Sequence, residues 1–131
     1  MYQVMMLSKR RPGLSMAEFV EKYETRHAPY AAEQMPTARR YVRRYFGPLS
    51  TADQPDDERE FDVATEIWFD DRAAYERAME RFADPVVAAR LAQDAQELFD
   101  PGRSTLRVHV EEQASQPGGG DGPVGADQGS F

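Results

Sequence analysis

The sequence predicts an α+β domain of the ferredoxin-like, split β-α-β type. The first observation is the order of the predicted elements, which reads β-α-β-β-α-(α)-β along the chain. The second is that the four strand-like segments are short and bounded by Gly, Pro or Asp. The third is the length of 131 residues, which suits one domain. Such an order gives a four-stranded antiparallel sheet with its helices on one face.

An apolar run and a capping box predict the first strand and the first helix. Residues 2–7 are apolar apart from one glutamine, and a Pro-Gly pair closes the loop that follows them. Ser15 and Glu18 have the spacing of a capping box, in which each side chain accepts a hydrogen bond from a free backbone N–H. We therefore expect a helix that begins here and carries Phe19 and Tyr23 on one stripe.

A histidine and a proline mark the end of this helix. His27 falls four residues after Tyr23, on the same stripe. Pro29 disfavours helical geometry at the preceding residue, so the helix should bend or restart there, with a short second piece over 30–35. Residues 39–46 then alternate aromatic or apolar side chains with arginine, which predicts the second strand.

The second half of the chain supplies two strands and two helices. Residues 49–60 are polar and should form an exposed loop, and residues 61–69 alternate as a third strand does. An aspartate pair caps the next helix, and Asp84 followed by Pro85 begins another. Residues 104–111 complete the sheet as the fourth strand.

A sheet of this kind leaves the face opposite its helices uncovered. Strand alternation predicts seven aromatic or charged side chains on that face. They are Tyr41, Arg43, Tyr45, Glu66, Trp68, Arg107 and His109. Such a face is too aromatic for a solvated surface and too charged for a core. We expect a second subunit, a small-molecule ligand or both to cover it, and we therefore predict a homodimer.

The composition argues against several partners and chemistries. The net charge is −7, from 23 acidic and 16 basic side chains, which disfavours nucleic acid and anionic membranes. The absence of cysteine excludes disulfides and a thiolate nucleophile. The two histidines lie far apart in the sequence, so we predict no metal site. No apolar stretch approaches the roughly 20 residues that span a bilayer, and we expect a cytoplasmic protein.

Two parts of different composition divide the chain. Residues 1–112 contain all of the predicted elements and form the expected domain. Residues 113–131 hold six of the nine glycines and have no apolar periodicity. Such a segment cannot bury enough surface to offset the entropy of ordering it, so we expect a flexible tail.

Two stretches of the sequence resemble the EthD domain family. The first reads Phe19-x-x-x-Tyr23-x-Thr25-Arg26-His27-Ala28-Pro29, followed by Arg40-Tyr41-Val42. The second reads Phe61-Asp62-Val63-Ala64-Thr65-Glu66-Ile67-Trp68-Phe69-Asp70. The resemblance covers roughly residues 2–112, and it departs at Tyr23, where the family more often has tryptophan.

The resemblance implies an architecture and a range of reactions. The architecture is a dimeric α/β barrel, with a small-molecule pocket between sheet and helices in each subunit. Aromatic polyketide cyclases, cofactor-free quinone-forming monooxygenases, muconolactone isomerases and fungal polyketide decarboxylases or dehydratases share it. The likeness therefore does not specify a substrate.

His27 is the first candidate for a catalytic residue. A neutral imidazole can take a proton near pH 7 and return it, as enolisation, aldol cyclisation or dehydration requires. The alternative is a structural histidine that binds a backbone carbonyl at the helix end, but the match to the family's His-Ala-Pro motif favours catalysis. His109, beside Arg107 in the last strand, is either a second proton-transfer group or part of the dimer interface, and we favour the interface.

The other candidates would bind the substrate. Arg43 and Tyr41 are predicted to hold a developing oxyanion, and for Arg43 an ion pair with an acidic residue is the alternative. Glu66 would pair with Arg43 or Arg107, or would orient a histidine. The expected substrate-binding residues are Tyr23, Tyr45, Glu66, Trp68, Arg107 and His109.

These features together predict a cofactor-independent enzyme that acts on an aromatic or polyketide-like, acidic small molecule. Its reaction would be proton transfer in a cyclisation, dehydration, isomerisation or decarboxylation, without a metal or an organic cofactor. Two alternatives stay open. One is a cofactor-free monooxygenase that deprotonates a phenolic or anthrone-type substrate, which then reduces oxygen itself. The other is a dimeric small-molecule-binding or accessory protein without catalytic activity.

Overall fold

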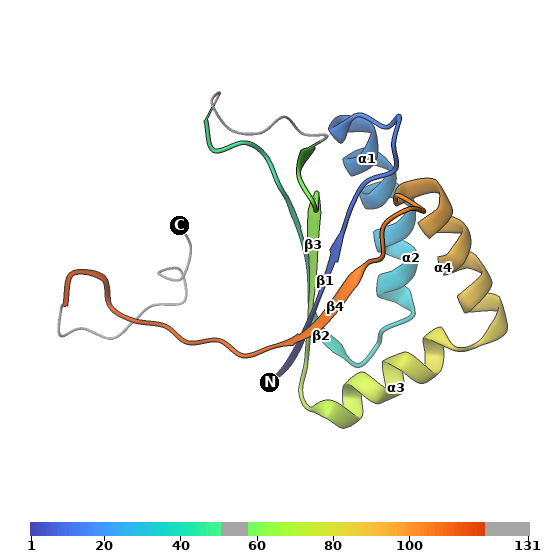
Figure 1. The fold of residues 1–131 in the computed structure, drawn as a ribbon. Helices are drawn as coiled ribbons and strands as arrows, with labels where there is room; N and C mark the ends of the chain where they lie inside the picture. Colours follow the sequence, from blue (N-terminus) through green and yellow to red (C-terminus); the bar gives the residue numbers. More distant parts are fainter. Residues whose placement is uncertain (51–57, 120–131) are drawn as a thin grey trace.

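A four-stranded antiparallel sheet with helices on one face makes up the computed structural model, which describes residues 1–50 and 58–119 (Figure 1). Its elements are β1 (Tyr2–Ser8), α1 (Met16–Lys22), the π-helical turn η1 (Tyr23–His27), α2 (Ala28–Glu33), β2 (Ala38–Tyr45), β3 (Val63–Phe69), α3 (Arg72–Phe82), α4 (Pro85–Leu98) and β4 (Leu106–Val110). The strands lie in the order β2-β3-β1-β4, which is the ferredoxin-like order. The predicted fold class is therefore confirmed.

The longer helices begin at the side chains that the sequence predicts. Ser15 accepts a hydrogen bond from the backbone N–H of Glu18, whose carboxylate accepts one from the N–H of Ser15, each at 3.1 Å. This completes the capping box. Asp71 caps α3 and Asp84 caps α4, where Pro85 occupies the first turn.

The expected break at Ala28 is absent. Ala28 has helical angles, φ −61° and ψ −44°, and α1, η1 and α2 follow one another without interruption. The Ala28 N–H bonds to the carbonyl of Tyr23, five residues back, and this wider step defines the π-helical turn. Pro29 lacks an N–H and would crowd the preceding turn of an α-helix. A wider turn just before the proline relieves that conflict without ending the helix.

The register of the strands corrects the predicted faces of β2 and β4. Tyr41, Arg43 and Tyr45 lie opposite Ile67, Thr65 and Val63, while Arg107 and His109 lie opposite Met6 and Val4. These five side chains share the helix-covered face, which was not expected. Only Glu66 and Trp68 of the seven predicted residues lie on the open face. Alternation shows which residues of one strand share a face, but pairing with the neighbouring strand decides which face it is.

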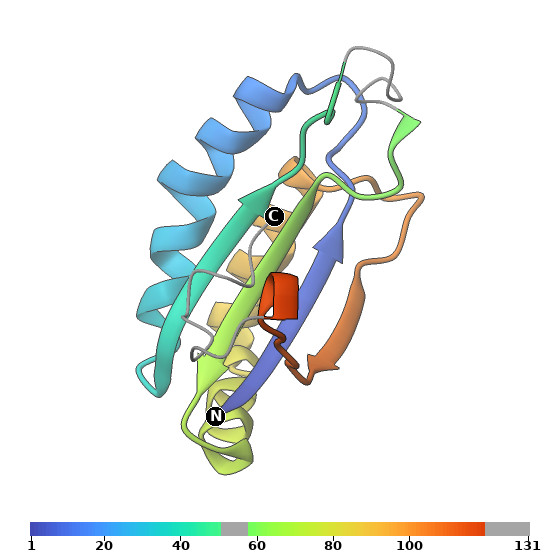
Figure 2. The ribbon, with the colours of Figure 1, turned by 90° about the vertical axis from the view of Figure 1, so that its left-hand side faces the viewer.

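The open face instead carries the apolar side of β4. Leu106 and Val108 lie opposite Leu7 and Met5, and they are 47% and 38% exposed. Figure 2 shows this face of the sheet toward the viewer, with the helices behind the strands. An apolar edge strand on an uncovered sheet face is a surface that proteins normally pair or cover.

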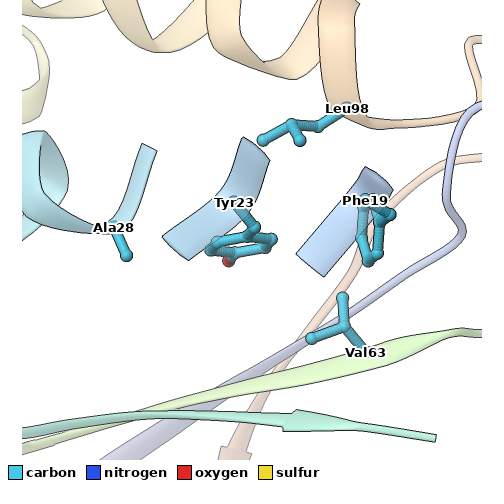
Figure 3. Packing of buried hydrophobic residues seen from close by; sticks show 5 residues of the cluster. All are labelled: Phe19, Tyr23, Ala28, Val63 and Leu98. Atoms are coloured by element: carbon cyan, nitrogen blue, oxygen red, sulfur yellow. The ribbon is translucent and has the colours of Figure 1, made fainter. Parts of the chain in front are cut away.

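Two clusters of buried side chains form the core beneath the helices. Phe19 and Val63 are fully buried in one of them, and Figure 3 shows the Phe19 ring directed from α1 toward Val63 on the sheet. The other cluster packs beneath α3 and consists of Met35, Ile67, Phe69, Ala74 and Ala78. Aromatic contacts extend the first cluster, since the rings of Phe19 and Tyr23 meet edge to face at 5.9 Å.

The chain leaves the sheet after β4 on the side opposite the helices (Figures 1 and 2). Residues 111–115 are exposed there. The predicted tail begins in this part of the chain, but residues 120–131 lie outside the described structure, as do residues 51–57 of the predicted loop. No helix of the described ranges is long and apolar enough to cross a membrane.

Candidate functional site

A cavity of about 530 Å³ lies between the helices and the sheet, and side chains from all four strands line it. Most of the lining is apolar or aromatic, which suits an organic ligand. Five of the nine predicted site residues belong to it, namely Tyr23, His27, Tyr41, Arg107 and His109. The structure places the other four outside the lining, namely Arg43, Tyr45, Glu66 and Trp68.

His27 lies in the wide turn η1 and binds a buried carboxylate. Its Nδ1 donates to Asp94 Oδ2 at 3.0 Å, and the two side chains are 14% and 8% exposed. The partner is thus a side chain of α4 and not the backbone carbonyl of a structural helix-end histidine. Within the described ranges no group bonds to the other ring nitrogen, Nε2. The ring meets Tyr23 edge to face at 5.1 Å.

Asp94 is held from its other side by an arginine of the same helix. Arg90 Nε donates to Asp94 Oδ1 at 3.1 Å, and the guanidinium lies 4.5 Å from the centre of the Tyr30 ring. Two donors therefore satisfy the buried carboxylate and fix its position. A carboxylate that accepts from Nδ1 selects the tautomer with its proton on that nitrogen, so Nε2 is left as a base.

Asp94 is not among the residues predicted for the site, although its position in the sequence carries a signal. Asp94 lies three residues after Leu91 and four before Leu98, which places it on the apolar stripe of α4. A carboxylate on a stripe that faces the core needs a partner, because an unpaired buried charge is costly. Such a position predicts a buried ion pair, and His27 is its partner in the structure.

Two phenols line the cavity, and the ring of one of them, Tyr23, contacts His27. The hydroxyls of Tyr23 and Thr65 share a hydrogen bond of 2.6 Å. Burial raises the pKa of the Tyr23 phenol. Burial is also the main cause of the raised pKa of Tyr41, and its neighbour Tyr23 adds to the effect. Both phenols therefore keep their protons at neutral pH and can act as hydrogen-bond donors.

Arg43 and Tyr45 form a polar group beside the cavity. Glu24 accepts hydrogen bonds from Arg43 Nε at 2.9 Å and Nη2 at 2.6 Å, and from the Tyr45 hydroxyl at 2.6 Å. These bonds from Arg43 are the main cause of the lowered pKa of Glu24. The guanidinium also lies 4.6 Å from the centre of the Tyr41 ring. Its planar fork is therefore taken up by a carboxylate of the chain, which is the ion-pair alternative for Arg43.

Glu66 and Trp68 lie on the open face, away from the cavity. Glu66 accepts a hydrogen bond from Arg44 Nε at 2.6 Å. It therefore pairs with neither of the arginines predicted for it and does not orient a histidine. Arg40 lies 4.8 Å from the centre of the Trp68 ring.

His109 borders the cavity where β4 forms the edge of the sheet. Its ring stacks on Tyr2 with centroids 4.6 Å apart and planes 15° apart. Tyr2 in turn contacts Tyr75 of α3 at 5.3 Å. His109 is thus a residue of the cavity wall, on the face opposite the one expected to pack against a second subunit. No cluster of three or more His, Asp or Glu suited to a metal occurs within residues 1–50 and 58–119.

Comparison with known proteins identifies one family and a set of distant structures. The EthD domain family matches residues 11–102. No curated protein matches the chain. The structure of an ethyl tert-butyl ether d (EthD) family protein from Bacillus halodurans superposes with a TM-score of 0.55 at 21% identity, over 86% of this chain and 100% of that one.

Two further solved structures share the fold at lower identity. A dimeric ferredoxin-like protein of unknown function from Thermobifida fusca has a TM-score of 0.52 and 13% identity, over 83% of this chain and 88% of that one. SnoaB, a cofactor-independent oxygenase from Streptomyces nogalater, has a TM-score of 0.51 and 15% identity, over 89% and 99%. Likeness at this level establishes the fold alone.

Proposed function

Because this chain belongs to the EthD domain family, we propose that it is a cofactor-independent enzyme that moves protons on an aromatic or polyketide-like small molecule. The reaction class is cyclisation, dehydration, isomerisation or decarboxylation. The observation that carries the proposal is the pair of His27 and Asp94, which lies at a mainly apolar cavity of about 530 Å³. A base with a fixed tautomer at an organic-ligand cavity is what enolisation requires.

The proposed step begins at Nε2 of His27. This nitrogen removes a proton from a carbon next to a carbonyl, and the electrons of the broken C–H bond move onto the carbonyl oxygen. The imidazolium that forms is stabilised by Asp94 at 3.0 Å. It then returns the proton to another carbon in an isomerisation, or to a departing hydroxyl, which leaves as water in a dehydration.

The phenols of Tyr41 and Tyr23 are the donors available to the developing oxyanion. Both line the cavity, and both keep their protons because burial raises their pKa. A donor aimed at a developing negative charge contributes on the order of 3 kcal/mol to transition-state stabilisation. Arg43 takes a supporting place in this scheme, since it lies against the Tyr41 ring and pairs with Glu24.

We also propose that the functional form is a homodimer that pairs through the open face of the sheet. Leu106 and Val108 are exposed there, and no helix of the described ranges covers that face (Figure 1). The Thermobifida fusca protein that shares the fold is described as dimeric. A stable pair of this kind buries roughly 1,200 Å² or more.

Hydrogen–deuterium exchange tests the proton-transfer step without knowledge of the natural substrate. The probe is 2-tetralone in D₂O, an aromatic ketone with acidic C–H bonds, followed by proton NMR. The wild-type protein should accelerate the exchange. His27→Gln should lose about 10²- to 10⁴-fold of that acceleration while its melting temperature stays close to the wild-type value. Full activity in His27→Gln would exclude the residue as the base.

Two further measurements separate the alternatives. Oxygen uptake with the anthrone dithranol would identify a cofactor-free monooxygenase, because that substrate reduces oxygen after deprotonation. If the protein binds 2-tetralone and neither exchange nor oxygen uptake exceeds the rate without protein, it is a binding protein and the enzymatic proposal is wrong. If His109→Gln loses the exchange activity and His27→Gln keeps it, the base is His109 at the mouth of the cavity and not His27.

A further inference from the structure

The charge of the cavity wall is opposite to the charge of the chain. The chain carries 23 acidic and 16 basic side chains. None of the 22 residues that line the cavity is Asp, Glu or Lys, and Arg107 is the one lining residue with a permanent charge. A permanently positive group in a mainly apolar wall attracts anions, while the acidic exterior of the protein repels them.

Arg107 also differs from Arg43 and Arg44 of β2, because its guanidinium has no partner among the described residues. Arg43 binds Glu24 and Arg44 binds Glu66, in each case through hydrogen bonds shorter than 3.0 Å. Among residues 1–50 and 58–119, Arg107 makes no ion pair or hydrogen bond. A guanidinium presents a planar set of donors that matches a carboxylate, and nothing in the described part of the chain takes up those of Arg107.

Strand register fixes how far Arg107 lies from the catalytic end. Thr65 lies opposite Met6, and Met6 lies opposite Arg107, so the three form a row across β3, β1 and β4. Thr65 hydrogen bonds to Tyr23, whose ring meets His27. Two steps between neighbouring strands separate Thr65 from Arg107, which is roughly 10 Å. A ligand that reaches from the pair of Tyr23 and Thr65 to Arg107 must be about that long.

We propose that Arg107 anchors an acid group of the substrate at the mouth of the cavity, so that the substrate is an elongated fused-ring aromatic acid. Its carboxylate lies at Arg107, its rings fill the apolar middle, and its reactive carbon reaches His27. The stacked rings of His109 and Tyr2 form an aromatic wall next to the anchor. This inference rests on the proposed function, since it names the substrate class of the same cavity.

Calorimetric titration with a matched pair of ligands tests the anchor. The pair is anthracene-2-carboxylate and anthracene-2-carboxamide, which share size and shape and differ in charge. The wild-type protein should bind the acid about tenfold more tightly than the amide at low salt, as a charge-assisted hydrogen bond provides. That preference should shrink as salt is added, because Arg107 is near solvent.

Arg107→Gln should bind the two ligands with nearly equal affinity. Arg77→Gln is the matched control, because Arg77 is an exposed arginine of α3 outside the cavity lining and also lacks a partner in the described ranges. It should keep the wild-type preference for the acid. The proposal that Arg107 binds the acid group is wrong if Arg107→Gln still prefers the acid to the amide, or if Arg77→Gln loses that preference. It is also wrong if the wild-type protein binds both ligands equally or binds neither.

The two proposals fail in different experiments. The titration involves no chemistry, so it reports the anchor alone. The exchange assay uses 2-tetralone, which carries no acid group, so it reports proton transfer alone. If the protein binds the acid more tightly than the amide and does not exchange 2-tetralone, the proposed role of Arg107 is supported and the enzymatic proposal is wrong. If the protein exchanges 2-tetralone but shows no preference for the acid, only the proposed role of Arg107 is wrong.

Discussion

At the scale of single residues, the hydrogen bond between His27 and Asp94 determines which ring nitrogen can act as a base. The sequence identified His27 through its place on a helical stripe and through the His-Ala-Pro motif. It did not reveal the partner, because the contact joins residues 67 positions apart in the chain. Asp94 could be recognised as unusual on its own helix, but only the packing of α4 against η1 shows what it binds.

We predict that Asp94→Asn lowers the rate of 2-tetralone exchange by on the order of 10²-fold or more, because an amide no longer selects the Nδ1–H tautomer. Nitrogen-15 NMR of the His27 ring should show the proton on Nδ1 in the wild-type protein and a mixture of tautomers in the variant. A structural role alone would lower the melting temperature of the variant and leave its rate of exchange unchanged. Glu97→Gln removes a surface ion pair with Arg26, and it should change neither the exchange rate nor the tautomer of His27.

A second prediction concerns Glu24 and the dependence of stability on pH. Arg43 lowers the pKa of Glu24 in the folded protein. The resulting stabilisation is fully present at pH values above the ordinary glutamate pKa of about 4.3. It is lost as the pH falls through the lowered pKa that Glu24 has in the folded protein. Glu24→Gln should therefore melt at a lower temperature than wild type at pH 7, and the two should converge in acid. Thermal melts at a series of pH values measure this, and a constant difference would contradict it.

At the scale of elements, the helix starts could be predicted and the wide turn could not. Caps depend on one side chain and its nearest neighbours, so Ser15, Asp71 and Asp84 mark their helices in the sequence itself. The π-helical turn is recognised by one hydrogen bond that spans five residues, and no single residue type signals it. The turn is visible in the spacing of the buried positions, which is four, five, three and four residues in succession. These positions are Phe19, Tyr23, Ala28, Ala31 and Met35.

A third prediction concerns the segment after β4. Residues 111–115 are exposed, and the composition from 113 onward offers no apolar face that could pack. We therefore propose that residues 1–112 form the folding unit, and that deletion of residues 114–131 leaves the melting temperature and the association state unchanged. Calorimetry and sedimentation of the truncated and full chains measure both. A fall of several degrees would mean that the segment docks on the domain.

At the scale of the whole molecule, the order of the elements could be predicted. Which face of β2 and of β4 points toward the helices could not. β3 is buried almost throughout, so its pattern alone did not constrain its neighbours. β2 has arginines on both of its faces, so either face was compatible with its composition, whereas β4 has one apolar and one polar face and turns the polar one toward the helices. Only the pairing of Arg43 with Thr65 and of Arg107 with Met6 across the sheet places these arginines under the helices. The same pairing turns Leu106 and Val108 outward.

The outward residues of β4 lead to a prediction about assembly. Leu106→Glu should weaken the proposed dimer at least tenfold, because it places a charge in an apolar contact between sheets. Val86→Glu is the control, since Val86 is an apolar side chain of α4 that is 75% exposed and lies away from the open face. Sedimentation at micromolar concentration should find wild type and Val86→Glu as dimers and Leu106→Glu as a monomer. If the wild-type protein is a monomer at this concentration, the proposed homodimer is wrong.

Strand β4 belongs to two surfaces at once. Arg107 and His109 border the cavity on one side, while Leu106 and Val108 face outward on the other. A ligand that holds the strand from within removes conformational freedom that a second subunit would otherwise have to restrict. Ligand binding and subunit association then favour each other by the same factor. The affinity for the ligand would therefore rise with the concentration of the protein, a cooperativity that neither surface would produce alone.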